Sequence, residues 1–376
     1  MDALEIHRLL RGKVHVSIPF KKADREILSL IYTPGVADVA KICAKEPEKT
    51  YQYTSRWNTI AVVSDGSAVL GLGNIGPYGA LPVMEGKAFL FKAFANLDAF
   101  PICLSESDEE KIIEIVRSLE PSFGGINLED IASPKCFKVL RELSQKMNIP
   151  VFHDDQQGTA VVVAAAFLNS LKLVGKRINE VKVVVNGIGA AGYNIVMFLL
   201  DLGVKNIVAV DKNGILNEKD SATCLNEYHL EIARVTNPEK ISGDLEKALE
   251  GADFFIGVSR GNILKPEWIK RMNKKPVIFA LANPVPEIEP KLAREAGAFI
   301  VATGRSDYPN QVNNLLAFPG IMKGAVERRT RITKEMLFSA IEAIAKSCDP
   351  EPYRIIPEAF DERVHMNVYY AVKNSV

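Results

Sequence analysis

The stretch Val181–Gly192, VKVVVNGIGAAG, decides the fold that the sequence predicts. It begins with an apolar run typical of a buried strand, and the apolar residues after it predict a helix through Leu200. Between strand and helix stands the pattern Gly-x-Gly-x-x-Gly, in the context that a dinucleotide-binding motif requires. Gly187 allows a tight turn, Gly189 lets the backbone approach a pyrophosphate, and Gly192 lets the helix pack closely on the strand. The candidate cofactor-binding loop is therefore Gly187, Ile188, Gly189, Ala190, Ala191 and Gly192.

The next predicted strand, NIVAVD, ends in an acidic residue that fits this motif. Asp211 follows the glycines by about 20 residues, where a carboxylate can accept hydrogen bonds from an adenosine ribose. A carboxylate repels a 2′-phosphate, so Asp211 favours NAD over NADP, whereas the neighbouring Lys212 favours the opposite. The alternative is a glycine-rich turn without a ligand, which does not account for strand, glycines, helix and acid together.

Outward from this motif, apolar strand-like runs alternate with helical stretches. Such alternation predicts a doubly wound parallel sheet of the Rossmann type over residues 151–330. Residues 1–150 predict a separate α/β unit with helices around Asp24–Tyr32 and Gly86–Asn96, and residues 331–376 predict helices that we expect to pack back on that unit. The strand candidates are TIAVVS, FPICLS and GGINLE in the first unit and VKVVVN, NIVAVD, ADFFIGVS, PVIFALAN and AFIVATG in the second.

A second Gly-x-Gly-x-x-Gly pattern spans residues 71–76. Pro77 and Pro82 follow it, so the sequence predicts no helix directly after the glycines, and no ribose acid ends a following strand. We interpret this second pattern as a structural turn.

Two pairs of acidic residues stand at the carboxyl ends of predicted strands. GGINLED places Glu129 and Asp130 at one end, and IPVFHDD places Asp154 and Asp155 at another. Ligand sites gather at this edge of parallel sheets, and converging carboxylates repel one another unless protons or a cation lie between them. Oxygen ligands favour Mg²⁺ or Mn²⁺, so the pairs indicate a site for a hard divalent metal. Alternatively the acids cap helices, as Asp155 could for a helix that begins near Gly158.

Three further residues are candidates with weaker signals. Lys87 lies in the apolar stretch MEGKAFLFKAF, where burial would lower its pKa and make it a general base, unless its amine reaches solvent. Tyr32 in LIYTPGV ends a predicted helix, from which its phenol could face a cleft or simply pack. His153 we interpret as a packed, hydrogen-bonded histidine rather than a ligand.

Composition excludes several classes of protein. Lys and Arg number 46 and Asp and Glu also 46, so no net positive charge is available for nucleic acid. The five cysteines form no CxxC pair, and the charged start MDALEIHRLLRGK shows no secretory signal, so we expect a cytoplasmic protein. The most apolar segment, Ala160–Leu168, is too short to span a bilayer and predicts a buried helix without a membrane partner.

The motifs together resemble one family. The segments YTPGVA, SDGSAVLGLGNIGP, LPVMEGKA, INLEDI, FHDDQQGTA, GIGAAG, ALANPVPEI and GRSDYPNQVNNLLAFPG run in the same order as in malic enzyme, in its short bacterial and archaeal form. The resemblance covers the chain from about residue 30 to residue 322. It implies oxidative decarboxylation of L-malate to pyruvate and CO₂, reduction of NAD or NADP, a requirement for Mg²⁺ or Mn²⁺, and at least a homodimer.

The resemblance also implies roles for single residues. It makes Lys87 the general base, Tyr32 the general acid, and Asp154 the residue that orients Lys87. Asn283 and Asn313 hold the substrate beside the nicotinamide, and Asn283 also contacts the cofactor. The implied metal ligands are Glu129, Asp130 and Asp155.

One position departs from the larger members of the family. They carry an arginine after the Asp-Gly of the strand turn to bind a malate carboxylate, whereas the matching residue here is Ala68. The position of Tyr32 near the N-terminus leaves open whether it serves its own active site or that of a neighbouring subunit. Two alternative functions stay open beside malic enzyme: a malolactic enzyme that releases lactate, and a sensor that binds a dinucleotide without chemistry.

Overall fold

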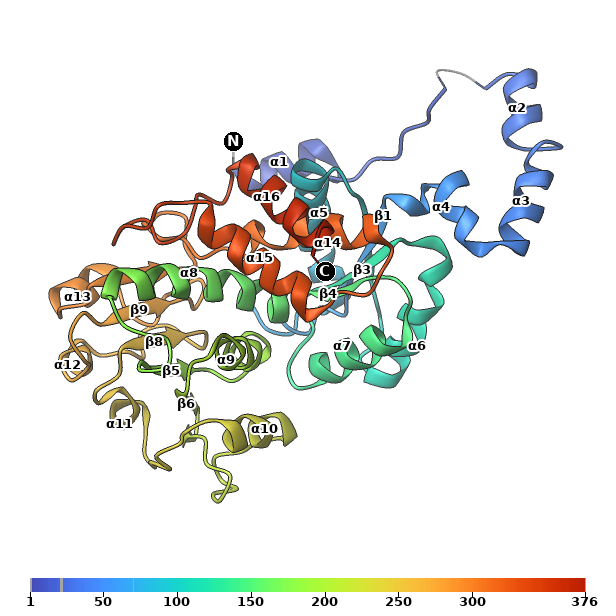
Figure 1. Cartoon of the computed structure of the whole chain (residues 1–376). Coiled ribbons are helices and arrows are strands. Elements are labelled where there is room, and N and C mark those ends of the chain that lie inside the picture. The colour runs from blue at the N-terminus through green and yellow to red at the C-terminus, as the bar shows by residue number, and fades with distance from the viewer. Residues whose placement is uncertain (1, 21–22, 70, 376) are drawn as a thin grey trace.

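The chain forms two mostly parallel sheets (Figure 1), in a computed structural model that describes residues 2–20, 23–69 and 71–375. The carboxyl ends of their parallel strands border a shared cavity. Within these residues the first sheet has the strand order β2-β1-β3-β4, and every neighbouring pair is parallel. Its strands are β1 (Thr59–Ser64), β2 (Asp98–Cys103), β3 (Gly125–Leu128) and β4 (Val151–His153). The three strands predicted for residues 1–150 are confirmed. The fourth strand begins just beyond that limit, at Val151, and it pairs with β3.

Helices cover the first sheet on both faces. They are α5 (Gly76–Ala95), α6 (Glu109–Ser118) and α7 (Lys135–Lys146). Helix α5 begins ten residues before the predicted Gly86, so the prediction that no helix follows the second glycine pattern is wrong. Pro77 stands in the first turn, where its missing N–H costs nothing, and Pro82 is accommodated inside the helix. The pattern over residues 71–76 is still a turn, in which Gly71 and Gly73 have positive φ.

The second sheet has the Rossmann-type arrangement that the sequence predicts. In the described residues its order is β10-β9-β8-β5-β6-β7, with only the short β7 antiparallel. The chain leaves β5 for β6 on one side and later returns to β8 on the other, which makes β5 the switch point where such sheets bind ligands. The strands are β5 (Lys182–Asn186), β6 (Asn206–Asp211), β7 (Gly214–Ile215), β8 (Phe254–Gly257), β9 (Val277–Ala280) and β10 (Ile300–Thr303). The helices among them are α9 (Ala190–Leu202), α10 (Glu227–Val235), α11 (Leu245–Leu249), α12 (Pro266–Ile269) and α13 (Pro290–Glu295).

A long apolar helix, α8 (Thr159–Val174), joins the two sheets. Asp154–Val174 and Arg25–Lys45 are long and apolar enough, by length and composition, to cross a membrane. The first of these is 67% buried inside the protein, because α8 packs against α9 and α15 and fills the core. The prediction of a buried helix over Ala160–Leu168 is therefore confirmed. The second segment is broken by a turn over residues 32–35.

The C-terminal helices close the structure over α8 and α5. They are α14 (Phe318–Arg328), α15 (Lys334–Lys346) and α16 (Glu362–Lys373). Helix α15 packs on α8, whereas α16 packs on α14 and α15 and also contacts α5 of the first unit. One hydrophobic core runs from β1 and α5 through α8 to β5 and these helices. A division into residues 1–150, 151–330 and 331–376 therefore stays a proposal about how the chain is organised.

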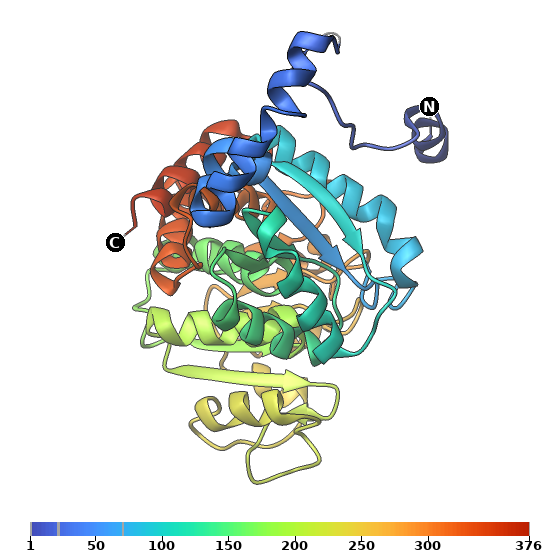
Figure 2. The ribbon, with the colours of Figure 1, turned by 90° about the vertical axis from the view of Figure 1, so that its right-hand side faces the viewer.

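Helices α2 (Arg25–Ile31) and α3 (Val36–Lys45) form an arm that extends away from this body (Figure 2). Neither helix contains a buried residue, and neither does α1 (Ala3–Leu10), which lies outside the arm. Asp24 caps α2 by accepting a hydrogen bond from the Ile27 N–H, and Tyr32 ends the helix, as the sequence predicts. The short α4 (Thr50–Tyr53) leads from the arm towards β1.

The contact between Phe91 of α5 and Phe318 of α14 gives a test of this core. Their rings pack edge to face with centroids 4.8 Å apart, and both side chains are fully buried. We expect Phe91→Ala to lower the free energy of unfolding in urea by about 3–5 kcal/mol, because it leaves a cavity between the two helices. The matched variant is Phe89→Ala, which changes a residue of α5 that is 56% exposed. It should lower the free energy of unfolding by roughly 0.5 kcal/mol or less. Equal losses in the two variants would contradict this packing.

Candidate active site

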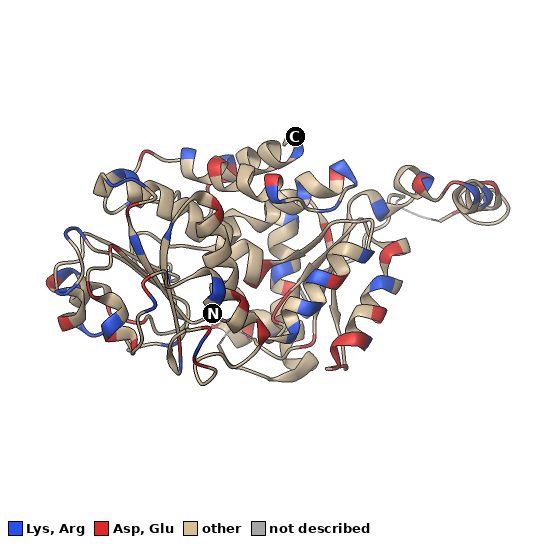
Figure 3. Ribbon diagram, turned by 60° about the horizontal axis from the view of Figure 1, so that its bottom comes forward, with Lys and Arg blue, Asp and Glu red and all other residues tan. Residues whose placement is uncertain are grey.

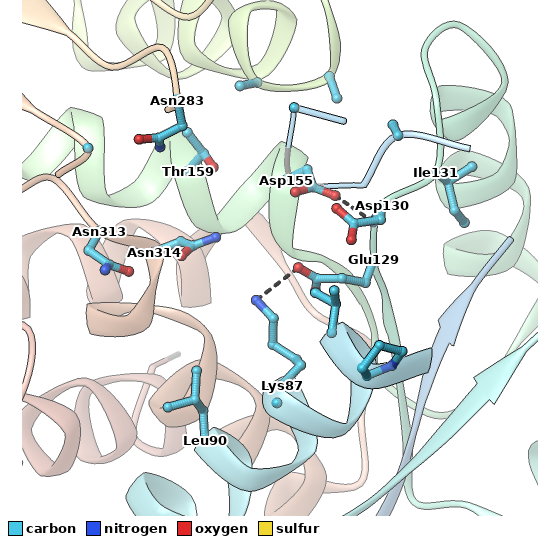
Figure 4. Close-up of a pocket in the computed structure, with 18 of the residues that line it drawn as sticks. Lys87, Leu90, Glu129, Asp130, Ile131, Asp155, Thr159, Asn283, Asn313 and Asn314 are labelled. Atoms are coloured by element: carbon cyan, nitrogen blue, oxygen red, sulfur yellow. Dashed lines mark hydrogen bonds and ion pairs between the residues drawn. The ribbon is translucent and has the colours of Figure 1, made fainter. Parts of the chain in front are cut away.

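A cavity of about 1430 Å³ lies between the carboxyl ends of the two sheets. One wall consists of α5 and the residues that follow β3 and β4. The other wall consists of the glycine-rich loop after β5 and the segments after β8, β9 and β10. In Figure 4 Lys87 and the carboxylates point into the cavity from one side, and Asn283 and Asn313 line the other. The two predicted groups, acids and dinucleotide loop, thus share one space.

Three carboxylates converge at one point of this cavity. Glu129 and Asp130 follow β3, Asp155 follows β4, and each offers an oxygen atom, with these atoms all within 4.8 Å of one another. Asp155 Oδ2 also accepts a 2.8 Å hydrogen bond from the Asp130 N–H, which holds the two strand ends together. Burial raises the pKa of Glu129 and of Asp155, because low polarity around them disfavours the charged form. The alternative that Asp155 caps the following helix does not hold, because the N-cap of α8 is Gly158 and no side chain makes a capping hydrogen bond there.

Lys87 is the positive charge beside this cluster. Its Nζ lies 2.9 Å from Glu129 Oε1 and 2.5 Å from Asp154 Oδ2, and 4.1 Å above the ring of Phe318. Burial by itself would lower the pKa of Lys87, but the charges of Asp154 and Glu129 outweigh it and raise the pKa above the ordinary value of lysine. The prediction that burial lowers this pKa is therefore wrong for the structure as it stands. The sequence left open whether the amine is buried or reaches solvent, and the structure shows Lys87 buried.

Asp154 lies behind Lys87 and is fully buried. Its Oδ2 accepts hydrogen bonds from Lys87 Nζ and from the side-chain amide of Asn314. Burial raises the pKa of Asp154, while the charge of Lys87 acts to lower it. The carboxylate therefore connects α5 to the segment before α14 and fixes the position of the lysine amine.

Asn314 was not singled out from the sequence, although it belongs to the motif NQVNN. The predicted Asn313 beside it lines the cavity, and its Oδ1 accepts a 2.9 Å hydrogen bond from the Leu315 N–H. Two adjacent asparagines were a visible signal, but the sequence does not say which one turns towards Asp154. Asn283 lines the cavity after β9, with its side-chain nitrogen close to Gly304.

His153 is packed as expected, but the expected hydrogen bond is not found. Among the described residues neither ring nitrogen has a hydrogen-bond partner, and Nδ1 lies 3.7 Å from Asp155 Oδ2. The side chain is fully buried at the end of β4, and this burial lowers the pKa of His153 to about 3. The imidazole is therefore neutral next to the carboxylate cluster.

The glycine-rich loop has the geometry that the motif predicts. Gly187 has a φ of +99°, and a Cβ at Gly192 would lie 1.8 Å from the carbonyl oxygen of Gly187, so both positions need glycine. A Cβ at Gly189 would meet no atom within 4 Å, which leaves open space beside the N-terminus of α9. Free N–H groups at such a helix end attract a phosphate. The cavity wall includes Ala190 and Ala191 of this loop.

Asp211 lies next to the same loop. Its Oδ2 accepts a 2.7 Å hydrogen bond from the Ile188 N–H. His229 of α10, which was not singled out from the sequence, approaches the other side of Ile188 with its Nε2 3.1 Å from the carbonyl oxygen. These two contacts fix the loop conformation where an adenosine ribose would lie after β6.

The structure places two further positions that were named from the sequence, one outside the cavity and one in its lining. Tyr32 is 68% exposed on the arm and does not line the cavity of its own chain. Ala68 lines the cavity, and within the described residues no arginine does.

The donor set fits a hard divalent metal. Glu129, Asp130 and Asp155 present three carboxylate oxygens at close range, and Lys87 forms an ion pair with Glu129 beside them. Buried carboxylates with raised pKa values are stabilised when a dication replaces their protons, and oxygen ligands suit Mg²⁺ or Mn²⁺.

The open space at Gly189 generates a prediction about the cofactor. We expect Gly189→Ala to leave the unfolding temperature within roughly 2 °C, because the new methyl group meets no atom of the protein. The affinity for NADH, measured by fluorescence titration, should fall by roughly tenfold or more, since the methyl group occupies the approach to the pyrophosphate. The matched variant Gly192→Ala should instead destabilise the fold, because its Cβ collides with Gly187. Unchanged NADH affinity in Gly189→Ala would show that the loop does not bind the pyrophosphate.

Comparison with known proteins identifies the family. The model of the malic enzyme N-terminal domain matches residues 11–111 and 105–144, and that of the malic enzyme NAD-binding domain matches residues 156–373. The chain is 51% identical to the NAD-dependent malic enzyme of Geobacillus stearothermophilus, over 96% of this chain and 76% of that protein. It is 50% identical to the bifunctional malic/malolactic enzyme of Bacillus subtilis, over 99% of this chain and 91% of that protein. A crystal structure of the NAD-dependent malic enzyme of Thermotoga maritima superposes with a TM-score of 0.99 at 81% identity, over 100% of both chains. The chain therefore belongs to the malic enzyme family.

Proposed function

We propose that this protein converts L-malate to pyruvate and CO₂ with reduction of NAD, and that it requires Mg²⁺ or Mn²⁺. One observation carries the proposal: the ion pairs of Lys87 with Glu129 and Asp154 lie in the same cavity as three convergent carboxylates and the loop of a dinucleotide fold. A sensor that only bound a dinucleotide would have no use for a buried lysine beside an acidic cluster. The NAD-dependent relatives support the choice of coenzyme.

The acidic cluster is the proposed metal site. Glu129, Asp130 and Asp155 would hold the ion, as the sequence resemblance implies. When bound, a divalent ion supplies Lewis-acid stabilisation of the negative charge that develops on the substrate as CO₂ leaves. Burial raises the pKa of Glu129 and of Asp155, and the charge of a bound ion would favour their ionised forms.

The dinucleotide would lie across the second sheet, with its pyrophosphate on the loop Gly187–Gly192 and its nicotinamide end at the cavity. A bound nicotinamide dinucleotide would supply the hydride acceptor for oxidation at C2 of malate. Asn283 and Asn313 line the cavity on that side and can orient the substrate by their amide groups. Asp211 supports NAD over NADP because a 2′-phosphate beside its carboxylate would be repelled.

Lys87 is the proposed general base. Its amine is held by Glu129, Asp154 and the face of Phe318, so it can take the C2 hydroxyl proton only from a substrate bound next to the amine. The carboxylates raise its pKa, and a proton-accepting lysine requires that their charge be neutralised first. Asp154, held by Asn314, is the positioning residue of this amine.

Tyr32 is the proposed general acid, acting on a second copy of the chain. Protonation of the substrate C3 atom after CO₂ leaves needs an acid at the cavity, and Tyr32 lies outside the cavity of its own chain. The arm that carries it exposes apolar side chains, namely Leu28, Leu30, Ile31, Val36 and Ile42. Exposed apolar surface of this kind is typical of an interface. A homodimer in which each arm covers its partner would bury these residues and deliver Tyr32.

We further propose that the protein is cytoplasmic and does not bind nucleic acid. All five cysteines are free, in line with a reducing compartment. Acidic and basic residues are interspersed along the helices in Figure 3, in line with a formal net charge of +0.

The test of the function is turnover of L-malate with Mn²⁺ and either NAD or NADP, with identification of the organic product. Pyruvate in equal amount to reduced cofactor is the expected result, with NAD as the better coenzyme. Lactate without net cofactor reduction would establish the malolactic reaction, a second candidate because a relative is named for both activities. Absence of turnover with either coenzyme would refute both and favour the sensor.

The shared site generates a prediction about mixed subunits. Lys87→Ala and Tyr32→Phe should each lower kcat by about 10²-fold or more, because each removes a proton-transfer group. Mixing the two inactive proteins under conditions of subunit exchange should restore activity, approaching about a quarter of the wild-type value if random exchange leaves one intact site in each mixed dimer. The matched control is Lys92→Ala, which changes a half-exposed lysine of the same helix and should keep full activity. Mixtures that stay inactive after exchange would place Tyr32 in its own subunit's site or outside catalysis.

A further inference from the structure

The segment between α1 and the arm crosses α5 at the mouth of the cavity. We call residues 12–15, GKVH, the strap. Glu85 of α5 holds it, because its Oε2 accepts a 3.2 Å hydrogen bond from the Lys13 N–H. Gly12 has a φ of +123°, and a Cβ added to it would lie 3.4 Å from Oε1 of Glu85. The local structure therefore needs a glycine next to Lys13 and fixes the direction in which Lys13 leaves the backbone.

The ammonium of Lys13 is held by a neutral partner only. Its Nζ donates a 2.9 Å hydrogen bond to the carbonyl oxygen of Pro82, and no carboxylate of the described residues lies within ion-pair distance of it. A carbonyl is a weaker partner for an ammonium than a carboxylate is. The side chain is partly buried, and it lines the cavity.

Binding of a dicarboxylate in this cavity calls for a positive charge in addition to Lys87 and a metal ion. Among the described residues that line the cavity there are two lysines, Lys87 and Lys13, and no arginine. Lys87 is already paired with Glu129 and Asp154, so without Lys13 a dication and Lys87 would set three positive charges against the four carboxylates of the site. A dicarboxylate adds two more negative charges, and Ala68 offers none in return.

The position of Lys13 shows which part of a substrate it can meet. Pro82 lies five residues before Lys87 on α5, so the two lysine sites are separated by about 7.5 Å along the helix axis at about 1.5 Å per residue. Pro82, Val83, Gly86 and Lys87 all line the cavity, so both sites lie on one face of the helix. A hydroxy acid bound by its hydroxyl group at Lys87 and the acidic cluster would extend any second carboxylate away from that cluster.

We propose that Lys13 binds the carboxylate of the substrate that lies away from the acidic cluster, and that it makes the site selective for dicarboxylic over monocarboxylic 2-hydroxy acids. This inference rests on the proposed function, because it concerns the same cavity. The flexible lysine exchanges the carbonyl oxygen of Pro82 for a carboxylate, and Glu85 keeps the strap in place during the exchange. Lys13 thus supplies a positive charge that Ala68, on another part of the cavity lining, cannot supply.

Binding of L-malate and L-lactate tests the proposal, because L-lactate lacks the second carboxylate but is otherwise the same 2-hydroxy acid. Calorimetric titrations with Mg²⁺ and NADH present would compare the wild type with Lys13→Met and Lys13→Arg. Lys13→Met should weaken L-malate binding by about tenfold or more and leave L-lactate binding within about twofold, since only one of them loses a charged hydrogen bond. Lys13→Arg should restore most of the L-malate affinity. The control is Arg8→Met, which removes a positive charge from α1 outside the cavity lining and should change neither affinity.

Two results would overturn the proposal. One is unchanged L-malate affinity in Lys13→Met, and the other is an equal loss for L-malate and L-lactate, which would mean general damage to the site. The titrations do not depend on turnover, so selectivity lost in Lys13→Met would support the role of Lys13 even if the wild type failed to produce pyruvate. Pyruvate production with unchanged selectivity in Lys13→Met would refute the role of Lys13 and leave the proposed function intact.

Discussion

The buried ion pairs of Lys87 hold the active-site region together. Its ammonium brings together α5, the end of β3 through Glu129 and the end of β4 through Asp154, and Asp154 in turn binds Asn314 before α14. Four distant parts of the chain therefore depend on one positive charge. Removing one partner of such a buried group leaves the others uncompensated, which costs far more than loss of a surface ion pair. The same constraint orients the lysine towards the cavity, so stability and chemistry share the same contacts.

Much of the site could be predicted because it follows from local patterns. The glycines between an apolar strand and an apolar helix predicted the loop at Gly187, and Asp211 lies beside that loop as its spacing indicated. The two acidic pairs were brought together because carboxyl ends of neighbouring parallel strands meet at one edge of a sheet. These features need only strand direction and sequence spacing.

Other features depend on contacts between distant residues, and the sequence did not show them. Asn314 meets Asp154 across 160 positions of the chain, and Glu85 holds the strap across 72. The pKa of Lys87 was predicted in the wrong direction, because burial was visible in its apolar neighbours but the two carboxylates beside it were not. The start of α5 at Gly76 was predicted wrongly for a different reason. Pro77 was taken as a sign that no helix follows, although proline fits the first turn of a helix.

The arrangement of charges links the arm, the strap and the acidic cluster. In the proposed function the acidic cluster binds a dication, the strap adds positive charge at the mouth of the cavity, and the arm supplies Tyr32 to a second copy of the chain. The proposed second copy would account for the apolar side chains that are exposed on the arm. The central claim is that the three carboxylates form a metal site.

Titration of the protein with Mn²⁺, followed by the electron paramagnetic resonance signal of the free ion, tests that claim most directly. We predict one tight site per chain in the wild type, and loss of that site in Glu129→Gln, while Glu267→Gln outside the cavity lining keeps it. Absence of tight binding in the wild type, or equal binding in Glu129→Gln, would contradict the account.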